Sequence, residues 1–328
     1  MRKLIETFPD QIEKAVKIGR ATSLPKLHGN ILNVVISGLG GSGIGGKIVA
    51  QLIQDQCNVP IITNNDYDLP AFVNASTLVV ISSYSGNTEE TISAMEQAIE
   101  NRAQVACVTS GGRVLELAKK HGFACIEIAG GNPPRSQFGY SVVEQLFLLN
   151  HFGLVKDSLI HELATIPAFL RQLQDSIVAK AEELAVPLLS KIPVIYAEAR
   201  MEGLAVRWRQ QINENAKRLC WHHVFPEMNH NELVGWEGAD DSIAVLMLQT
   251  PADNPRTLKR MEITRGLFER KTSAIAEVMA QGTTRAEHLF YLVHLGDWLS
   301  LLVAEKANVN PVSIDSINFL KNELSKIS

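Results

Sequence analysis

The chain has 328 residues, of which 46% are hydrophobic and 20% charged, and its formal net charge at pH 7 is −4. A chain of this length makes one large or two medium globular units. The small negative charge leaves no basic excess to hold a nucleic-acid backbone. We therefore expect a globular protein that does not bind nucleic acid.

The N-terminus and the cysteines indicate where the protein works. Residues 1–19 have the pattern of an amphipathic helix with acidic residues, and no later segment is apolar over the length that a bilayer requires. The four cysteines include no Cys-x-x-Cys pair, and Cys107 and Cys125 lie in apolar runs, where we expect small buried side chains. These features favour a reduced, cytoplasmic location without membrane association.

Short apolar runs alternate with helix-period segments along the first half. The runs are rich in Val and Ile and end in Gly, Ser or Asn, as buried parallel strands do. They cover residues 31–38, 60–64, 76–82, 104–110 and 124–130, and a helix is expected over 140–154. This alternation predicts a doubly wound α/β sheet.

The same alternation returns after a polar helical stretch near residues 158–190. Further strands are expected at residues 192–199, 241–250 and 272–280. The sequence therefore predicts an α/β protein of two doubly wound subdomains, each a mostly parallel sheet flanked by helices. The predicted domains are 1–155 and 156–328.

A glycine-rich loop, SGLGGSGIGGK, follows the first expected strand. Gly38, Gly40 and Gly43 have the G-x-G-x-x-G spacing of dinucleotide-binding loops. Open α/β sheets bind ligands at the carboxyl ends of their strands, and Asp66 follows the second strand, where a ribose-binding acid is expected. A nicotinamide oxidoreductase is therefore one hypothesis, and a tight turn without a ligand is another.

A hydroxyl-rich loop, SSYSGNTEET, follows the third expected strand. It holds Ser82, Ser83, Ser85 and Thr88, together with one glycine, at the start of a helix. Hydroxyl donors, close backbone approach and helix-start amides make a cradle for a phosphate dianion. A dinucleotide fold has no special use for these hydroxyls, and the remaining alternative is a plain Ser/Thr helix cap. The two loops together favour a phosphate site.

Three motifs in order, GLGGSGIGG, SSYSGNTEET and PPRSQFGYS, resemble a sugar isomerase (SIS) domain. With INENAK, FPEMNHNELVGW and INFLK in the second half, the chain resembles the bifunctional phosphoglucose/phosphomannose isomerase family over nearly its whole length. The serine loops are shared with many sugar-phosphate proteins, whereas the Asn-His-Asn-Glu stretch is much more specific. The resemblance implies conversion of glucose 6-phosphate and mannose 6-phosphate to fructose 6-phosphate.

The resemblance also implies which residues hold the substrate phosphate. The hydroxyl contacts are Ser42, Ser83, Ser85 and Thr88, and the backbone contacts are Gly41 and Gly43. A zinc-dependent mannose phosphate isomerase would need histidines and acids at ligand spacing, and the chain has no His-x-His or His-x-x-x-His motif. We therefore expect no metal and no cofactor.

Moving a proton between C2 and C1 of the sugar suits a carboxylate, because a carboxylate that accepts the proton can return it to the neighbouring carbon. Glu214 stands between two asparagines and near basic residues in RWRQQINENAKR. A solvated glutamate on a helix face is the commoner case. The resemblance favours Glu214 as the proton shuttle.

Opening of the sugar ring requires a group that donates and accepts protons at neutral pH, which suits histidine. His230 in MNHNE is flanked by amides placed to orient its imidazole. In relatives of this kind the histidine enters the active site from the other subunit, which implies a homodimer with composite sites. His222 and His223 are adjacent, so in a strand they would point to opposite faces and bind no metal together.

Two basic residues complete the implied site. Arg135 follows two prolines that fix the backbone, and its guanidinium is placed to stabilise an enediolate. A surface arginine in a turn is the alternative. Lys321 resembles the family lysine that assists ring opening, and it equally fits the solvent face of a terminal helix.

A third hypothesis is a regulator that binds sugar phosphates without converting them. Such a protein would carry a helix-turn-helix, for which the first 30 residues are too short. It would also leave the glutamate and histidine motifs unexplained. The isomerase is therefore the leading hypothesis, ahead of the regulator and the oxidoreductase.

Overall fold

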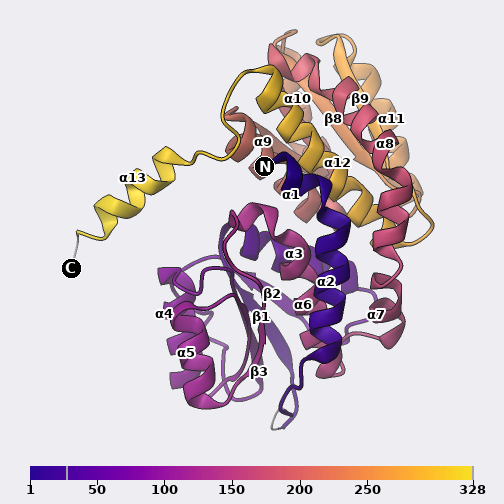
Figure 1. Cartoon of the computed structure of the whole chain (residues 1–328). Coiled ribbons are helices and arrows are strands. Elements are labelled where there is room, and N and C mark those ends of the chain that lie inside the picture. The colour runs from indigo at the N-terminus through magenta and orange to yellow at the C-terminus, as the bar shows by residue number, and fades with distance from the viewer. Residues whose placement is uncertain (27–28, 327–328) are drawn as a thin grey trace. The chain divides into compact units, whose positions relative to one another are not determined.

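The computed structural model describes residues 1–26 and 29–326 (Figure 1). Contacts divide the chain into two compact units. The N-terminal unit comprises Lys3–Gln174 and Gln281–Tyr291, and the C-terminal unit comprises Met1–Arg2, Asp175–Ala280 and the chain from Leu292 onward. Residues 156–174, predicted to belong to the second domain, thus lie in the N-terminal unit. The domain bounds 1–155 and 156–328 stay a prediction.

Five parallel strands form the sheet of the N-terminal unit. They are β1 (Asn33–Ser37), β2 (Ile61–Asn64), β3 (Thr77–Ser83), β4 (Gln104–Thr109) and β5 (Ala124–Glu127). Their order is β2-β1-β3-β4-β5, and every neighbouring pair is parallel. All five overlap the runs predicted from the sequence. The central strand β3 is buried along its whole length, as its apolar sequence requires.

Helices cover both faces of this sheet (Figure 1). One face is covered by α4 (Glu89–Glu100) and α5 (Gly112–His121), and the other by α3 (Gly40–Ile53) and α6 (Phe138–His151), with α2 (Phe8–Ala21) packed against α6. A core of buried Val, Ile, Leu and Met side chains fills the layer between the sheet and the pair α4 and α5. The predicted doubly wound fold is confirmed for this unit.

The C-terminal unit has a second parallel sheet. Its strands are β6 (Ile192–Glu198), β7 (Trp221–Phe225), β8 (Ile243–Gln249) and β9 (Ala274–Met279), in the order β7-β6-β8-β9. Three of these strands were predicted, and β7 was missed. Its sequence, WHHVF, is no apolar run, because an edge strand leaves Trp221 exposed and the two histidines half-buried.

The second sheet is also covered on both faces. On one face lies α9 (Glu202–Ala216), which is hydrogen-bonded to α12 (Arg285–Lys306), and on the other lie the short α10 (Glu232–Gly235) and α11 (Pro255–Phe268). The last described helix is α13 (Asp315–Leu324), which contains no buried residue.

Two predicted helical stretches are interrupted in the structure. The N-terminal helix divides into α1 (Arg2–Glu6) and α2, and the stretch near 158–190 divides into α7 (Asp157–Leu163) and α8 (Ile166–Ala185). Each second helix has a proline at or near its first position, Pro9 or Pro167. Proline lacks the N–H that would continue the preceding helix, so the chain breaks there.

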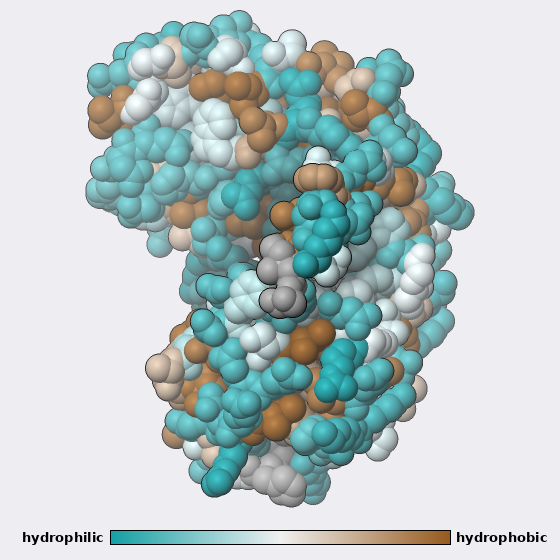
Figure 2. All heavy atoms as spheres, turned by 90° about the vertical axis from the view of Figure 1, so that its left-hand side faces the viewer, coloured by the Kyte–Doolittle hydropathy of each residue, from teal (hydrophilic) through white to brown (hydrophobic). Residues whose placement is uncertain are grey.

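Among the helices in the described part of the chain, none combines the length and the apolarity that crossing a membrane requires. On the face shown in Figure 2, hydrophilic residues predominate and hydrophobic residues are scattered among them.

Candidate active site

The strand order of the N-terminal sheet defines where a ligand is expected. The chain runs outward from β1 to β2 on one side and from β3 to β5 on the other, so the direction of winding switches between β1 and β3. Ligands of open α/β sheets bind beyond the carboxyl ends of the strands at such a switch point. The two loops that follow β1 and β3 are the glycine-rich and the hydroxyl-rich loops of the sequence.

Glycines allow these loops to pack at backbone distance. A Cβ on Gly38 would stand 2.6 Å from the Ser82 carbonyl oxygen, and one on Gly43 would stand 2.3 Å from the Gly38 carbonyl oxygen. A Cβ on Gly41 would lie 3.1 Å from the Pro134 carbonyl oxygen and 3.3 Å from the Arg135 Cα. The segment that carries Arg135 therefore lies directly against the glycine-rich loop.

Tyr84 connects its own loop by hydrogen bonds to three other segments of this unit. Its backbone N–H donates to Ser42 Oγ at 3.1 Å, and its carbonyl oxygen accepts from Ser110 Oγ at 2.6 Å. Its hydroxyl accepts from the backbone N–H of Asn132 at 3.1 Å. Tyr84 was not predicted from the sequence, where its only signal is its place between the serines of SSYSG.

The hydroxyl groups divide between two directions. Ser82 Oγ contacts Gln145 Nε2 at 3.2 Å and Ser141 Oγ at 3.4 Å, both on α6. Its strand neighbour Ser83 points the other way, as adjacent strand residues do, and donates to Thr88 Oγ1 at 3.4 Å. Ser82 therefore packs inside the unit, while Ser83 and Thr88 meet at the start of α4.

The start of α4 keeps the features of an anion cradle. Thr88 is the residue before the helix, but its side chain makes no capping hydrogen bond. Ser85 is exposed, and its Oγ accepts from the Asn87 N–H at 3.3 Å. Hydroxyls therefore surround a helix N-terminus that its own cap residue leaves open, which suits a bound anion.

Arg135 lies in the 3-10 turn η1 (Pro134–Ser136) and is only 4% exposed. The alternative of a surface arginine is therefore wrong. Gln11 of α2 holds this turn: its Nε2 donates to the Ser136 carbonyl oxygen at 2.8 Å, and its Oε1 accepts from the Gly139 N–H at 2.7 Å. Arg135 is therefore a buried side chain on a held turn whose backbone lies against the glycine-rich loop.

Glu214 is half-buried near the end of α9, in the C-terminal unit. The buried face of α9 is held by Asp297 of α12, which receives Arg207 Nη2 at 2.8 Å on each oxygen and Gln211 Nε2 at 2.7 Å. One position after Glu214, Asn215 Nδ2 donates to Ser300 Oγ at 3.0 Å.

These inward contacts recur every four residues along α9, so they fix the rotation of the helix about its axis. Glu214 is thereby held at the margin of the buried face of α9. Asp297 is a positioning residue that the sequence analysis missed, because nothing in LGDWLS marks its partners.

His230 ends the 3-10 turn η4 (Glu227–His230), which follows β7, and its imidazole is exposed. The flanking amides bond elsewhere: Asn229 Nδ2 donates to Thr264 Oγ1 at 3.1 Å, and Asn231 Oδ1 accepts from the Glu232 N–H at 2.6 Å. The two amides therefore fix the loop and do not orient the ring as predicted.

Glu232 anchors the far end of the His230 loop. Its carboxylate accepts a hydrogen bond from the Tyr196 hydroxyl, which also accepts from Trp236 Nε1 at 2.9 Å. Burial and the neighbouring Glu232 raise the pKa of Tyr196, so the phenol keeps its proton and remains a donor.

Lys321 lies on α13, with its side chain exposed. It stands on a different element from Glu214 and His230, and all three belong to the C-terminal unit.

Comparison with known proteins decides the family. The chain is 38% identical to a bifunctional phosphoglucose/phosphomannose isomerase of Caldicellulosiruptor bescii over 337 residues, covering 100% of this chain and 99% of the relative. This chain belongs to the bifunctional phosphoglucose/phosphomannose isomerase family. An Aquifex aeolicus protein of that name is 34% identical over 89% of this chain and 90% of its own length. Residues 177–324 match the family model of the bacterial phospho-glucose isomerase C-terminal SIS domain.

Solved structures confirm the fold expected of this isomerase family. The C-terminal domain of glucosamine-fructose-6-phosphate aminotransferase from Francisella tularensis superposes with a TM-score of 0.73, at 14% identity over 96% of this chain and 97% of that one. Tagatose-6-phosphate ketose/aldose isomerase from Escherichia coli gives 0.72, at 12% identity over 94% and 93%. At these identities the likeness concerns the fold alone.

Proposed function

We infer that the protein is a cofactor-free aldose-ketose isomerase. It interconverts glucose 6-phosphate and mannose 6-phosphate with fructose 6-phosphate through an enediol. The full-length match to the bifunctional isomerases carries this proposal. The loops favour an isomerase over an oxidoreductase. The G-x-G-x-x-G loop is followed, after β3, by a hydroxyl-rich loop, which suits a sugar phosphate and has no special use in a dinucleotide site.

The substrate phosphate would bind between the two loops of the N-terminal unit. Its hydroxyl donors would be Ser42, Ser83, Ser85 and Thr88. Its backbone donors would be Gly41 and Gly43, of which the Gly43 N–H already donates to the Leu39 carbonyl oxygen at 3.1 Å. The uncapped start of α4 and the close packing of the glycines support this assignment. Because Ser42 already accepts from the Tyr84 N–H, its hydroxyl hydrogen is directed elsewhere and remains available to a phosphate oxygen.

The chemistry would then proceed in two stages. His230 and Lys321 transfer the protons that open the sugar ring. Glu214 next removes the proton from C2, so the electron pair of that C–H bond forms the C1–C2 double bond and the C1 carbonyl pair moves onto O1. O1 then gains a proton, the O2 hydroxyl loses one as C2 becomes the carbonyl carbon, and Glu214 returns its proton to C1. Arg135 stabilises the negative charge that the oxygen carries in the enediolate. The half-buried position of Glu214 and the burial of Arg135 support these roles.

The protein would work as a cytoplasmic homodimer in which each subunit donates His230 to the partner's site. His230 lies on an exposed loop, which supports such a donation.

The rate of fructose 6-phosphate formation from each sugar, measured with protein treated with a chelator, tests the function. We expect turnover of both sugars. Binding of sugar phosphate without turnover would favour the regulator, and binding of reduced nicotinamide would favour the oxidoreductase.

A further inference from the structure

The second sheet has a switch point of its own. Its order β7-β6-β8-β9 repeats the arrangement β2-β1-β3-β4 of the first sheet, so the winding direction changes between β6 and β8. The equivalent place in the first sheet, between β1 and β3, carries the candidate phosphate loops. A second ligand crevice is therefore expected beyond the ends of β6 and β8.

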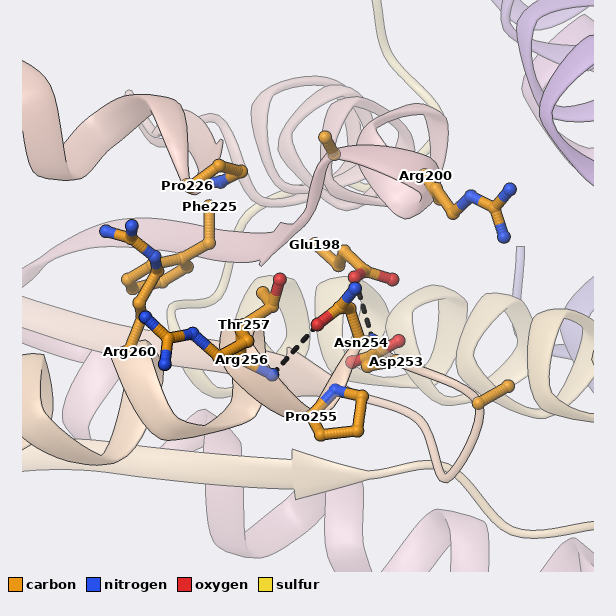
Figure 3. A pocket seen from close by; sticks show the side chains of 12 residues that line it. Glu198, Arg200, Phe225, Pro226, Asp253, Asn254, Pro255, Arg256, Thr257 and Arg260 are labelled. Carbon is orange, nitrogen blue, oxygen red and sulfur yellow. Dashed lines mark hydrogen bonds between the residues drawn. The ribbon is translucent and has the colours of Figure 1, made fainter.

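A cavity of about 560 Å³ lies at this place (Figure 3). It is formed by the residues that end β6 and β7, by the loop after β8 and by the first turns of α11. Its volume lies within the range of small-molecule sites, which is about 300–1,000 Å³. It is large enough for a phosphorylated sugar.

Two arginines place positive charge in the cavity, at a position where positive charge does not stabilise the fold. Arg256 and Arg260 lie four residues apart on one face of α11, in its first two turns. Positive charge is disfavoured at the positive end of a helix, and like charges four residues apart repel. No acidic residue in the first turn of α11 compensates this charge. An anion bound in the cavity would be attracted by both guanidinium groups and by the positive end of the helix, and would offset the repulsion among them.

The arginine side chains are available for such an anion. Arg256 is exposed, and Arg260 Nη1 donates only to Asn229 Oδ1, at 3.4 Å. Among residues 1–26 and 29–326, no carboxylate forms an ion pair with either guanidinium. Arg200 also lines the cavity, but in Figure 3 its guanidinium points away from the other two. The proposal therefore depends on Arg256 and Arg260.

Two buried acids line the opposite part of the cavity (Figure 3). Asp253 is bound by its own loop, accepting from the Thr250 N–H at 2.9 Å and from Thr250 Oγ1 at 2.6 Å. Glu198 Oε1 accepts from the Asn254 N–H at 2.9 Å. These carboxylates disfavour a second negative group and suit the hydroxyls of a neutral polyol.

We propose that this cavity is a second binding site, which takes a phosphate monoester of a polyhydroxylated molecule. Arg256 and Arg260 bind the phosphate, and Glu198 accepts hydrogen bonds from the hydroxyl groups. The N–H of Arg256 is already bonded to Asn254 Oδ1 at 2.8 Å, so the guanidinium groups supply most of the attraction. The cavity therefore differs in its phosphate-binding groups from the candidate site at the start of α4, where hydroxyls and backbone amides are the expected donors.

Calorimetric titration of the full chain with glucose 6-phosphate tests the proposal. We expect two ligands per chain. The Arg256→Gln/Arg260→Gln variant should lose one of them or weaken it by at least about tenfold, because charge-assisted hydrogen bonds are the strong ones. Ser83→Ala/Thr88→Val should weaken the other site. The matched control is Lys259→Gln, which removes a positive charge from the same helix outside the cavity lining and should retain both sites.

Three results would overturn the proposal. One is a single site per chain in the wild-type protein, and another is two undiminished sites in the double arginine variant. The third concerns the polyol part: inorganic phosphate that binds the second site as tightly as glucose 6-phosphate would exclude contacts to the hydroxyls.

The ligand-free arginine variant should melt no lower than the wild type, because it removes charge repulsion at the start of α11. Isomerase turnover is measured separately, so failure of the proposed function is recognised independently.

Discussion

Glu144 lies on α6 with no exposed surface, and neither of its carboxylate oxygens has a hydrogen-bond partner in the described part of the chain. Burial raises the pKa of Glu144 from 4.5 to about 9, so the side chain is neutral at neutral pH. The folded state therefore binds this proton more tightly than the unfolded state. The resulting stability is fully present below pH 4.5 and is lost as the pH rises to about 9.

Glu144→Gln removes this ionisation and tests its effect. The variant should equal the wild type in free energy of unfolding near pH 4 and exceed it by more than about 1 kcal/mol at pH 8. Urea unfolding at the two pH values measures the difference. Glu182→Gln, an exposed control, should show no such gain, and a variant less stable than the wild type at pH 8 would refute the neutral carboxyl.

Arg135 provides a second prediction for a single residue. Arg135→Gln should lower kcat about 10²-fold to 10³-fold with a smaller change in KM, because the charge it stabilises develops only in the transition state. Arg135→Lys keeps the charge but loses the planar fork and should recover part of the rate. Steady-state kinetics on fructose 6-phosphate formation measures both. A raised KM with unchanged kcat would instead place Arg135 on the substrate phosphate.

Among the elements, α9 depends on one buried carboxylate. Asp297→Asn removes the carboxylate that Arg207 binds with Nη2 on both oxygens, in a site where Arg207 is 2% exposed, and we expect a loss of about 3–5 kcal/mol in stability. Replacing both partners, as Arg207→Met with Asp297→Leu, should restore much of this loss because no unpaired charge remains. Denaturant unfolding measures both variants. A loss below about 1 kcal/mol in Asp297→Asn would contradict the account of α9.

The elements also show how far the sequence could predict the fold. The central strands β1, β3, β4, β6 and β8 were recognisable because they are buried on both faces, which leaves a continuous apolar run. The edge strand β7 carries Trp and two His instead and was missed. The breaks at Pro9 and Pro167 follow from the missing proline N–H, although the helical period continues through them.

The candidate site was predictable where its chemistry is local. The glycine and hydroxyl loops are recognisable because each lies within about ten consecutive residues. Tyr84 bonds to Ser42 and Asn132, which are 42 and 48 positions away, and Arg207 pairs with Asp297 at a separation of 90. No periodic pattern records such distant partners, so these residues were missed.

At the scale of the whole molecule, the proposed homodimer predicts that two inactive variants complement each other. In a hybrid of Glu214→Gln and His230→Ala subunits, donation of His230 across the interface leaves one of the two sites intact. Mixing the variants under conditions of subunit exchange should restore up to about a quarter of wild-type turnover. No recovery, with hybrid dimers present, would mean that His230 acts in its own chain.

The central claim is that Glu214 carries the proton in both isomerisations. Its most direct test is the turnover of glucose 6-phosphate and of mannose 6-phosphate by metal-stripped Glu214→Gln, with Glu182→Gln as the control. We expect both rates to fall by about 10³-fold or more while the control keeps the wild-type rates. Turnover of either sugar at the wild-type rate in Glu214→Gln would contradict the account.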